Sequence, residues 1–224
     1  MKKLRVRIPI YLIGLFLMTI GIALSVKSDL GVSPVSSIPY TMTCVWGTEM
    51  GKATILFHAG LVILQLLILR ADFRLINLLQ VPIGVIFGYY TTFSNDLFSL
   101  LPDTQNLVIR FGMMVLSAFL IAFGIFLYLP ADLPPLAGEG AMQTLAQVSG
   151  IEIAKVKIAF DCSMVGISAL VCVWMLHSLG SVGLGTVIAA VLVGFFLGLL
   201  TRKLGAQRDR LYGVTAEPAD EGCE

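Results

Sequence analysis

Six long apolar stretches constrain this chain of 224 residues more than any other feature. A helix that crosses a bilayer needs about 20 largely apolar residues, and such stretches lie at about 8–27, 51–70, 75–98, 107–129, 154–177 and 181–201. The composition agrees: 57% of the residues are hydrophobic and 13% are charged, against about 45–50% and about 25% in soluble domains. We therefore expect an all-α, polytopic membrane protein with six transmembrane helices.

Lysine and arginine in the short connections predict the orientation of these helices. Basic residues precede the first span at 2–7, follow the second at 70–74 and follow the sixth at 202–210. With six spans all three groups fall on one side, so we expect both termini in the cytoplasm. The polar segment 205–224 is expected to be a disordered cytoplasmic tail.

The chain also repeats itself at a spacing of 103 residues. Twelve residues within 21–58 are identical to the residue 103 positions later, and the matches include Asp29 with Asp132, Thr41 with Thr144, Glu49 with Glu152 and Lys52 with Lys155. Each copy holds three spans, so the second (104–204) would enter the membrane upside down relative to the first (1–103). Such inverted repeats are common in secondary transporters; a duplicated helix bundle without a transport role is the alternative.

Each copy contains a segment that is too apolar for a solvated loop and too broken for a span. The first occupies 28–50, where Pro34 and Pro39 are expected to interrupt any helix, and the second occupies 132–149. Each is predicted to be a Gly/Pro break followed by a helix of about three turns, either re-entrant or lying on the membrane surface. Paired breaks of this kind indicate the binding site of a transporter, because irregular backbone at membrane depth must face protein or a water-filled cavity.

The polar side chains of the broken segments and of two later spans are the candidate solute ligands. Helix N-termini at the breaks would present free N–H groups, which suit an anionic or carboxylate-bearing group. Serines in the first copy correspond to an acid and a glycine in the second, so the site would suit a ligand with two different ends. The candidates are Ser33, Ser36, Ser37, Tyr40, Asp132, Glu139 and Gln143, with Gln80 and Thr186 lining the cavity.

Ion pairs at the starts of two spans are candidates for gating. Glu49 with Lys52, and Glu152 with Lys155, are spaced i, i+3, so each pair shares one helix face. Each could be an ion pair that caps the helix at the membrane interface, or a gate whose pairing changes between conformations.

Two further ionisable residues lie deeper in their spans. His58 and Asp161 are equivalent in the two copies and lie about 10 Å from the starts of their helices at 1.5 Å per residue. Ionisable groups at such depth are rare, and both proton coupling and a structural hydrogen bond fit. Asp29 is included with this gating or coupling set.

Other classes of protein are disfavoured. The chain has no HExxH, Walker A, GxSxG or GxGxxG motif in a fitting context, so we expect neither an enzyme nor a bound cofactor or metal. A net charge of +1 does not indicate nucleic-acid binding. The cysteines have no CxxC spacing and are interpreted as packing residues: Cys44, Cys162, Cys172 and Cys223.

Several short motifs resemble the YczE/YitT-type bacterial integral membrane proteins. They are Leu30-Gly-Val-Ser-Pro34 after Gly21-Ile-Ala-Leu24, Gly138-Glu-Gly140, Lys155-Val-Lys-Ile-Ala-Phe-Asp161 and Gly183-Leu-Gly-Thr186. The resemblance covers about residues 5–203. It implies about six helices in a bacterial cytoplasmic membrane, and the short C-terminal tail favours the YczE branch over the YitT branch, which usually carries an added soluble domain.

These features together predict a small secondary transporter of a small polar or anionic solute, bound between the two broken segments near the membrane midplane, with proton coupling as one mechanism. The expected partners are the solute, the lipid bilayer and a second copy in a homodimer. The alternatives are a substrate-capture subunit of a larger energised transporter and a membrane scaffold or sensor partner without transport.

Overall fold

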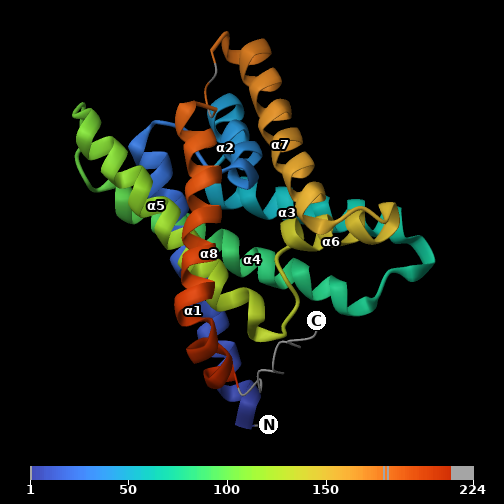
Figure 1. The fold of residues 1–224 in the computed structure, drawn as a ribbon. Coiled ribbons are helices and arrows are strands. Elements are labelled where there is room, and N and C mark those ends of the chain that lie inside the picture. Colours follow the sequence, from blue (N-terminus) through green and yellow to red (C-terminus); the bar gives the residue numbers. More distant parts are fainter. Residues whose placement is uncertain (1, 179, 181, 213–224) are drawn as a thin grey trace, which may run out of the picture.

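The computed structural model describes residues 2–178, 180 and 182–212, and in this part of the chain it contains helices and no strands. Figure 1 shows their arrangement. The α-helices are α1 (Lys2–Ser28), α2 (Pro34–Trp46), α3 (Met50–Leu69), α4 (Gln80–Ser99), α5 (Leu107–Tyr128), α6 (Ala137–Ser149), α7 (Ile153–Leu176) and α8 (Leu184–Tyr212). Three short 3₁₀ helices connect them: η1 (Arg70–Asp72), η2 (Leu75–Leu79) and η3 (Leu129–Ala131).

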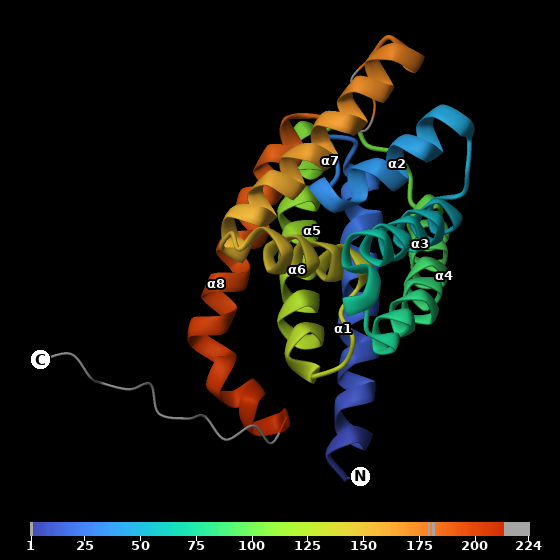
Figure 2. The ribbon, with the colours of Figure 1, turned by 90° about the vertical axis from the view of Figure 1, so that its right-hand side faces the viewer.

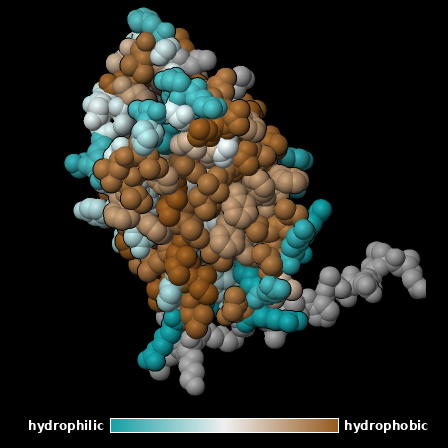
Figure 3. Space-filling view, turned by 90° about the vertical axis from the view of Figure 1, so that its left-hand side faces the viewer, coloured by the Kyte–Doolittle hydropathy of each residue, from teal (hydrophilic) through white to brown (hydrophobic). Residues whose placement is uncertain are grey.

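Six of these helices are long and apolar enough to cross a membrane, which confirms the predicted spans. They occupy Arg5–Ser28, Met50–Leu69, Leu75–Ser99, Leu107–Ala131, Ile153–Leu176 and Gly185–Tyr212. On the face drawn in Figure 3, apolar side chains cover the middle and hydrophilic side chains gather toward the upper and lower ends. This distribution is the one that a bilayer requires of a multi-pass protein.

Helices α1 and α5 pack along their length as an antiparallel pair at the centre of the molecule (Figure 2). Glycines permit this close approach, because a Cβ added at Gly14 would lie 2.9 Å from the Gly124 carbonyl oxygen, and one added at Gly124 would lie 2.6 Å from the Gly14 oxygen. Two turns further along, the Ser117 hydroxyl donates a hydrogen bond of 2.7 Å to the Gly21 carbonyl. Small residues at helix crossings are typical of membrane interiors.

An ion pair lies at each end of this helix pair. At one end Arg110 Nη2 lies 2.8 Å from Asp29 Oδ2, and at the other Arg7 Nη1 lies 3.2 Å from Asp132 Oδ2. The partners are related by the 103-residue spacing, since Arg7 corresponds to Arg110 and Asp29 to Asp132. In both pairs the arginine side chain is 16% exposed, whereas the aspartates are 81% and 83% exposed.

The two broken segments contain the short helices α2 and α6, each of 13 residues. Both follow a residue in extended conformation, Ser33 or Leu136, and both end at a glycine in the left-handed conformation. Gly47 (φ 63°) and Gly150 (φ 68°) adopt this conformation at no steric cost. Helix α2 packs against α7 and α3, and α6 packs against α3 and α7.

The expectation that both prolines interrupt the first segment is wrong for Pro39, which lies inside α2. Pro34 starts the helix instead, at a position where no backbone hydrogen bond is lost because the first-turn N–H groups have no partner in the helix. Pro39 costs one such bond, and the packing of α2 between α3 and α7 holds the helix together despite this loss.

Helix α8 continues to Tyr212, so the expected disordered tail does not include 205–212. Tertiary contacts stabilise this extension: the Arg208 guanidinium lies 4.7 Å from the centre of the Phe126 ring, and the Tyr212 hydroxyl donates to the Leu127 carbonyl. Arg7 also donates to the Tyr212 carbonyl at 3.2 Å, which places the start of α1 and the end of α8 together (Figure 1). The rest of the predicted tail, 213–224, lies outside the described residues.

Candidate functional site

The larger polar cavity, which we term the charged cavity, has a volume of about 610 Å³. It lies where α1 and α4 end and where α5 begins, and Tyr40 of α2 borders it. Three carboxylates and two basic groups line it together with the amide of Asn95, so its ionised groups sum to one negative charge. These charged residues are Lys27, Asp29, Asp96, Asp103 and Arg110.

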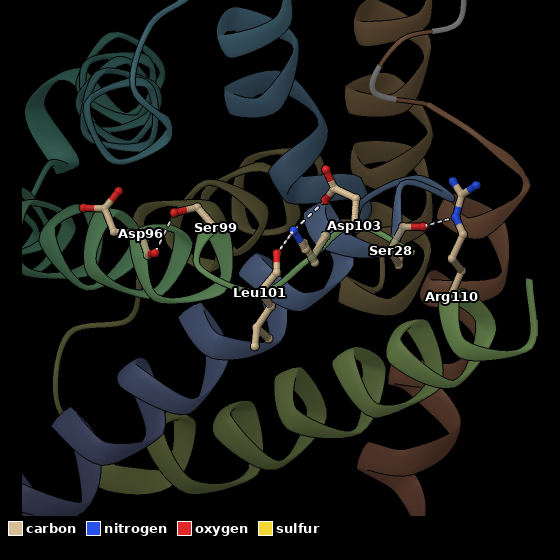
Figure 4. A network of polar contacts seen from close by, with 7 residues as sticks. Ser28, Asp96, Ser99, Leu101, Asp103 and Arg110 are labelled. Carbon is tan, nitrogen blue, oxygen red and sulfur yellow. Dashed lines mark hydrogen bonds and ion pairs between the residues drawn. The ribbon is translucent and has the colours of Figure 1, made fainter. Parts of the chain in front are cut away.

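The two basic groups of the charged cavity form hydrogen bonds and ion pairs with residues of the cavity wall (Figure 4). Lys27 Nζ donates to the Leu101 carbonyl at 2.6 Å and to Asp103 Oδ1 at 2.5 Å. This amine holds the pKa of the Asp103 carboxyl below its usual value. Arg110 Nε donates to the Ser28 carbonyl at 2.7 Å, and its Nη2 donates to the backbone and side-chain oxygens of Asp29. Asp96 keeps an exposed carboxylate toward the cavity.

We expect Arg110→Ala to lower the thermal midpoint of the purified protein much more than Asp29→Asn does. Alanine removes two bonds from a charged donor to backbone carbonyls at the end of α1, and such bonds are each worth about 1.5–3 kcal/mol. Asp29→Asn removes an exposed ion pair worth about 0–1 kcal/mol. Asparagine also tolerates the left-handed backbone that Asp29 adopts (φ 50°). Equal losses for the two variants would contradict this assignment.

The second cavity, which we term the amide cavity, has a volume of about 250 Å³. It lies between the end of α3, the start of α4 and one face of α6. Five primary amides line it, with Asp72 and Arg74 from the connection between α3 and α4. The amides are those of Gln65, Asn77, Gln80, Gln143 and Gln147.

Two of these amides form a closed pair against α6. Gln65 Nε2 donates to Gln80 Oε1 at 2.9 Å, and Gln80 Nε2 donates back to Gln65 Oε1 at 3.2 Å. Gln65 Nε2 also lies 3.3 Å from the Ala137 carbonyl, and the two glutamines are 1% and 2% exposed. A Cβ at Gly140 would lie 2.6 Å from Gln80 Nε2 and 2.9 Å from Gln65 Oε1, so any larger residue would require the amide pair to shift.

The two cavities lie at opposite ends of α4, which carries Gln80 in one and Asn95 in the other. The 20 residues of this helix span roughly 30 Å. Each cavity also touches one short helix at an equivalent position, Tyr40 on α2 and Gln143 on α6, which are 103 residues apart. Four predicted ligand or coupling residues therefore line a cavity: Asp29, Tyr40, Gln80 and Gln143.

The predicted serine and threonine ligands lie in helix contacts rather than in either cavity. Ser33 donates to the Ser36 hydroxyl at 3.0 Å. Ser37 is fully buried, donates to the Pro34 carbonyl at 2.6 Å and accepts a bond of 2.9 Å from Ser168 of α7. Thr186 is buried against Gly31 and accepts a hydrogen bond from the Gly183 amide at 3.2 Å. Asp132 lies apart from them in the ion pair with Arg7.

The predicted gating pairs are present at the starts of α3 and α7. Lys52 Nζ lies 3.0 Å from Glu49 Oε2, and Lys155 Nζ lies 3.9 Å from Glu152 Oε2. Glu49 also accepts a hydrogen bond from Thr92 of α4. This hydroxyl and Lys52 hold the pKa of Glu49 below its usual value. The second pair has both side chains at least two-thirds exposed.

The two deep ionisable residues differ in their surroundings. His58 is 4% exposed, stacks on Phe87 with ring centres 5.5 Å apart and lies beside Gly84. Its Nδ1 is buried without a hydrogen-bond partner. Asp161 pairs with Lys157 of the same helix at 2.8 Å, and its second carboxylate oxygen is buried without a partner. The two residues are not brought together.

Several residues of these cavities were not predicted from the sequence. Gln65 is a polar residue within an apolar span, and that contrast was the available signal for a buried partner. The charged residues of the charged cavity that the sequence did not predict are Lys27, Asp96, Asp103 and Arg110. Only the fold brings the ends of α1 and α4 to the start of α5.

Among residues 2–178, 180 and 182–212, no group of three or more His, Cys, Asp or Glu side chains could hold a metal ion. Of the cysteines with described side chains, Cys44 lies on α2, and Cys162 and Cys172 lie on α7. Cys172 is buried, with its sulfur 3.6 Å from the Thr41 hydroxyl, and Cys223 lies outside the described residues.

Comparison with known proteins identifies the family. The model of a family of unknown function, DUF6198, matches residues 5–202. The uncharacterized membrane protein YczE of Bacillus subtilis (strain 168) is 25% identical over 197 residues, which are 88% of this chain and 86% of YczE. No solved structure matches the chain. The resemblance to YczE predicted from the motifs is thus confirmed. The chain belongs to the family of unknown function DUF6198 and is a YczE-like, multi-pass membrane protein.

Proposed function

We propose that this protein is a small secondary transporter of a small polar solute in a bacterial cytoplasmic membrane, with both termini in the cytoplasm. The observation that carries the proposal is the pair of polar cavities at opposite ends of α4, each bordered by one of the two short helices. A carrier needs polar surface that can be reached from each side in turn, and inverted repeats provide two equivalent half-sites for this purpose.

The proposed architecture is two inverted halves, with α1–α4 equivalent to α5–α8. Equivalent contacts between the halves support it. A shift of 103 residues relates Arg7 to Arg110 and Asp29 to Asp132, so the ion pairs Arg7–Asp132 and Arg110–Asp29 are equivalent. The packing of α2 on α7 exchanges likewise with that of α6 on α3. In this architecture α2 and α6 are re-entrant half-helices entering from opposite sides.

The proposed path runs past the N-terminal ends of α2 and α6. These ends approach at Gly138, where an added Cβ would lie 3.4 Å from Val35 Cγ1. We take this contact as the barrier between the cavities. The α1–α5 pair is the fixed part of the carrier, because both of its ion pairs are formed at the same time.

The charges of the cavities favour a neutral or zwitterionic polar solute over an anion. The charged cavity has three carboxylates against two basic groups, both of which are bonded to its wall. The amide cavity has one carboxylate, one guanidinium and five amides, and amides offer both donors and acceptors.

A binding screen followed by flux measurement tests this function. A ligand that binds only the folded protein raises its thermal midpoint. At a ligand concentration of 100 times the dissociation constant, the free energy of unfolding increases by about 2.7 kcal/mol. Purified protein would be screened against a panel of neutral, zwitterionic and anionic metabolites. Uptake of each labelled hit would then be measured in liposomes that contain this protein alone.

We expect Gln143→Trp to reduce uptake of the hit at least tenfold, because indole fills the amide cavity. The matched control is Val148→Trp on the same helix, where the side chain is 61% exposed and lines neither cavity. Binding of a hit without uptake by the protein alone would contradict the carrier and favour a capture subunit. No hit across the panel would favour a scaffold.

A further inference from the structure

A carboxylate in the first turn of α6 lies outside both cavities. Glu139 is partly buried and lies in the same turn as Gly140, the residue against which the amide pair packs. Its carboxyl lies close to the hydroxyl of Tyr128 on α5 and within electrostatic range of Tyr11 on α1. No ion pair to Glu139 is formed by the described residues at distances up to 4.0 Å.

The Tyr128 hydroxyl is the second feature of this place. Tyr128 is 1% exposed, and its hydroxyl oxygen has no hydrogen-bond partner of good geometry among the described residues. An orphaned buried hydroxyl costs about 1–3 kcal/mol. The neighbouring Tyr11 does not satisfy it, because the Tyr11 hydroxyl donates to the Pro134 carbonyl at 2.8 Å. The Tyr128 hydroxyl is therefore still available to hydrogen bond with the neighbouring Glu139 carboxyl.

The charges around Glu139 do not balance. Helix α7 presents one cation, Lys157, and a second carboxylate, Asp161, and these two are paired with each other at 2.8 Å. Helices α5 and α1 present the neutral phenols Tyr128 and Tyr11. From α3 and α4, which also pack on α6, come amides that do not titrate. Two carboxylates thus share one ammonium group, and burying an uncompensated charge is costly.

We propose that Glu139 is the site of an exchangeable proton, held between its carboxyl and the Tyr128 hydroxyl. In the protonated state the carboxyl O–H can donate to the tyrosine oxygen, which satisfies both groups. In the ionised state the tyrosine O–H donates to the carboxylate. The proton is taken from and returned to water, and no other bond changes.

The relation of this site to transport rests on the proposed function. Glu139 is four residues from Gln143, so it shares a helix face with a residue that lines the amide cavity. Loss of its proton would add a negative charge at the start of α6, next to the contact between Gly138 and Val35. Protonation of Glu139 would in this way be coupled to the movement of α6, a role that the sequence suggested for His58 and Asp161.

Infrared difference spectroscopy tests the proton site directly and without a solute. The full-length protein in lipid bilayers would be titrated in sodium-free buffer while the carbonyl stretch of protonated carboxylic acids is recorded. We expect a component that persists at neutral pH, where exposed carboxylates are ionised. This component should be lost in Glu139→Gln and retained in Glu152→Gln, a control that removes an exposed carboxylate near α7.

Tyr128→Phe distinguishes a proton site from a merely structural role. Phenylalanine keeps the packing but removes the hydroxyl that can donate to the carboxylate, so the midpoint of the Glu139 band should move to higher pH. An unchanged midpoint, or a neutral-pH band that survives Glu139→Gln, would overturn the proposal. Because these measurements need no transport, they can succeed even where the carrier function fails.

Discussion

Gly124→Val is expected to leave little folded protein, whereas Gly112→Val in the same helix should fold normally. A Cβ at Gly124 would lie 2.6 Å from the Gly14 carbonyl oxygen and 3.0 Å from the Met18 amide nitrogen. Both are backbone atoms of α1, so relief requires separation of the two helices rather than a change of rotamer. Overpacking costs about 1–3 kcal/mol even where side chains can yield, and here two backbones would have to separate.

The comparison isolates packing from other effects of a larger side chain. Gly112 is exposed on α5, and a Cβ added there would meet nothing within 4 Å. Both variants add the same branched side chain to the same helix. The measurement is the fraction of detergent-solubilised protein that elutes as a single species in size-exclusion chromatography, together with its thermal midpoint. Equal recovery of the two variants would show that the α1–α5 contact is not the structural centre of the fold.

The second large effect is expected at the buried amide pair. Gln80→Leu removes one partner and leaves the Gln65 carbonyl oxygen and one of its N–H groups without bonds inside the protein. Each such orphaned group costs about 1–3 kcal/mol. The double variant Gln65→Leu with Gln80→Leu removes both partners, and replacing both by apolar groups of similar shape is nearly neutral.

The single variant should therefore be less stable than the double variant, although the double variant carries more changes. Thermal midpoints of wild type, both single variants and the double variant form a double-mutant cycle that measures the coupling directly. The matched control is Asn77→Leu, which alters another amide of the cavity wall outside the pair. Additive losses in the cycle would mean that the two glutamines act independently.

The sequence predicted the spans well because lipid imposes a simple length and composition rule on them. The expected first span at about 8–27 corresponds to Arg5–Ser28, and the expected fourth at 107–129 corresponds to Leu107–Ala131. The position of the breaks was equally accessible, since prolines and glycines have local backbone effects. Pro34 begins a helix as an N-terminal proline does, and Gly47 ends it.

The sequence did not predict features that depend on tertiary contacts. The extension of α8 through Arg208 to Tyr212 is stabilised by Phe126 and Leu127 on another helix, and a polar sequence gives no sign of this. The pairing of Gln65 with Gln80 requires the turn between α3 and α4 and the bare backbone at Gly140. The serines expected to surround a solute lie instead in contacts between helices, since Ser37 accepts a hydrogen bond from Ser168 of α7.

We propose that the two halves are inverted in the membrane. Asp29 and Asp132 test it well, because they are equivalent in the two halves, lie at opposite ends of the α1–α5 pair and are 81% and 83% exposed. Each would be replaced by cysteine in a protein whose four native cysteines are alanine. A membrane-impermeant thiol reagent would then be added to intact cells and to inside-out membrane vesicles.

Inverted halves with cytoplasmic termini predict that Asp29→Cys reacts in intact cells and that Asp132→Cys reacts in inside-out vesicles. Reaction of both cysteines in the same preparation would mean that the halves enter the membrane in the same direction, which would contradict an inverted repeat.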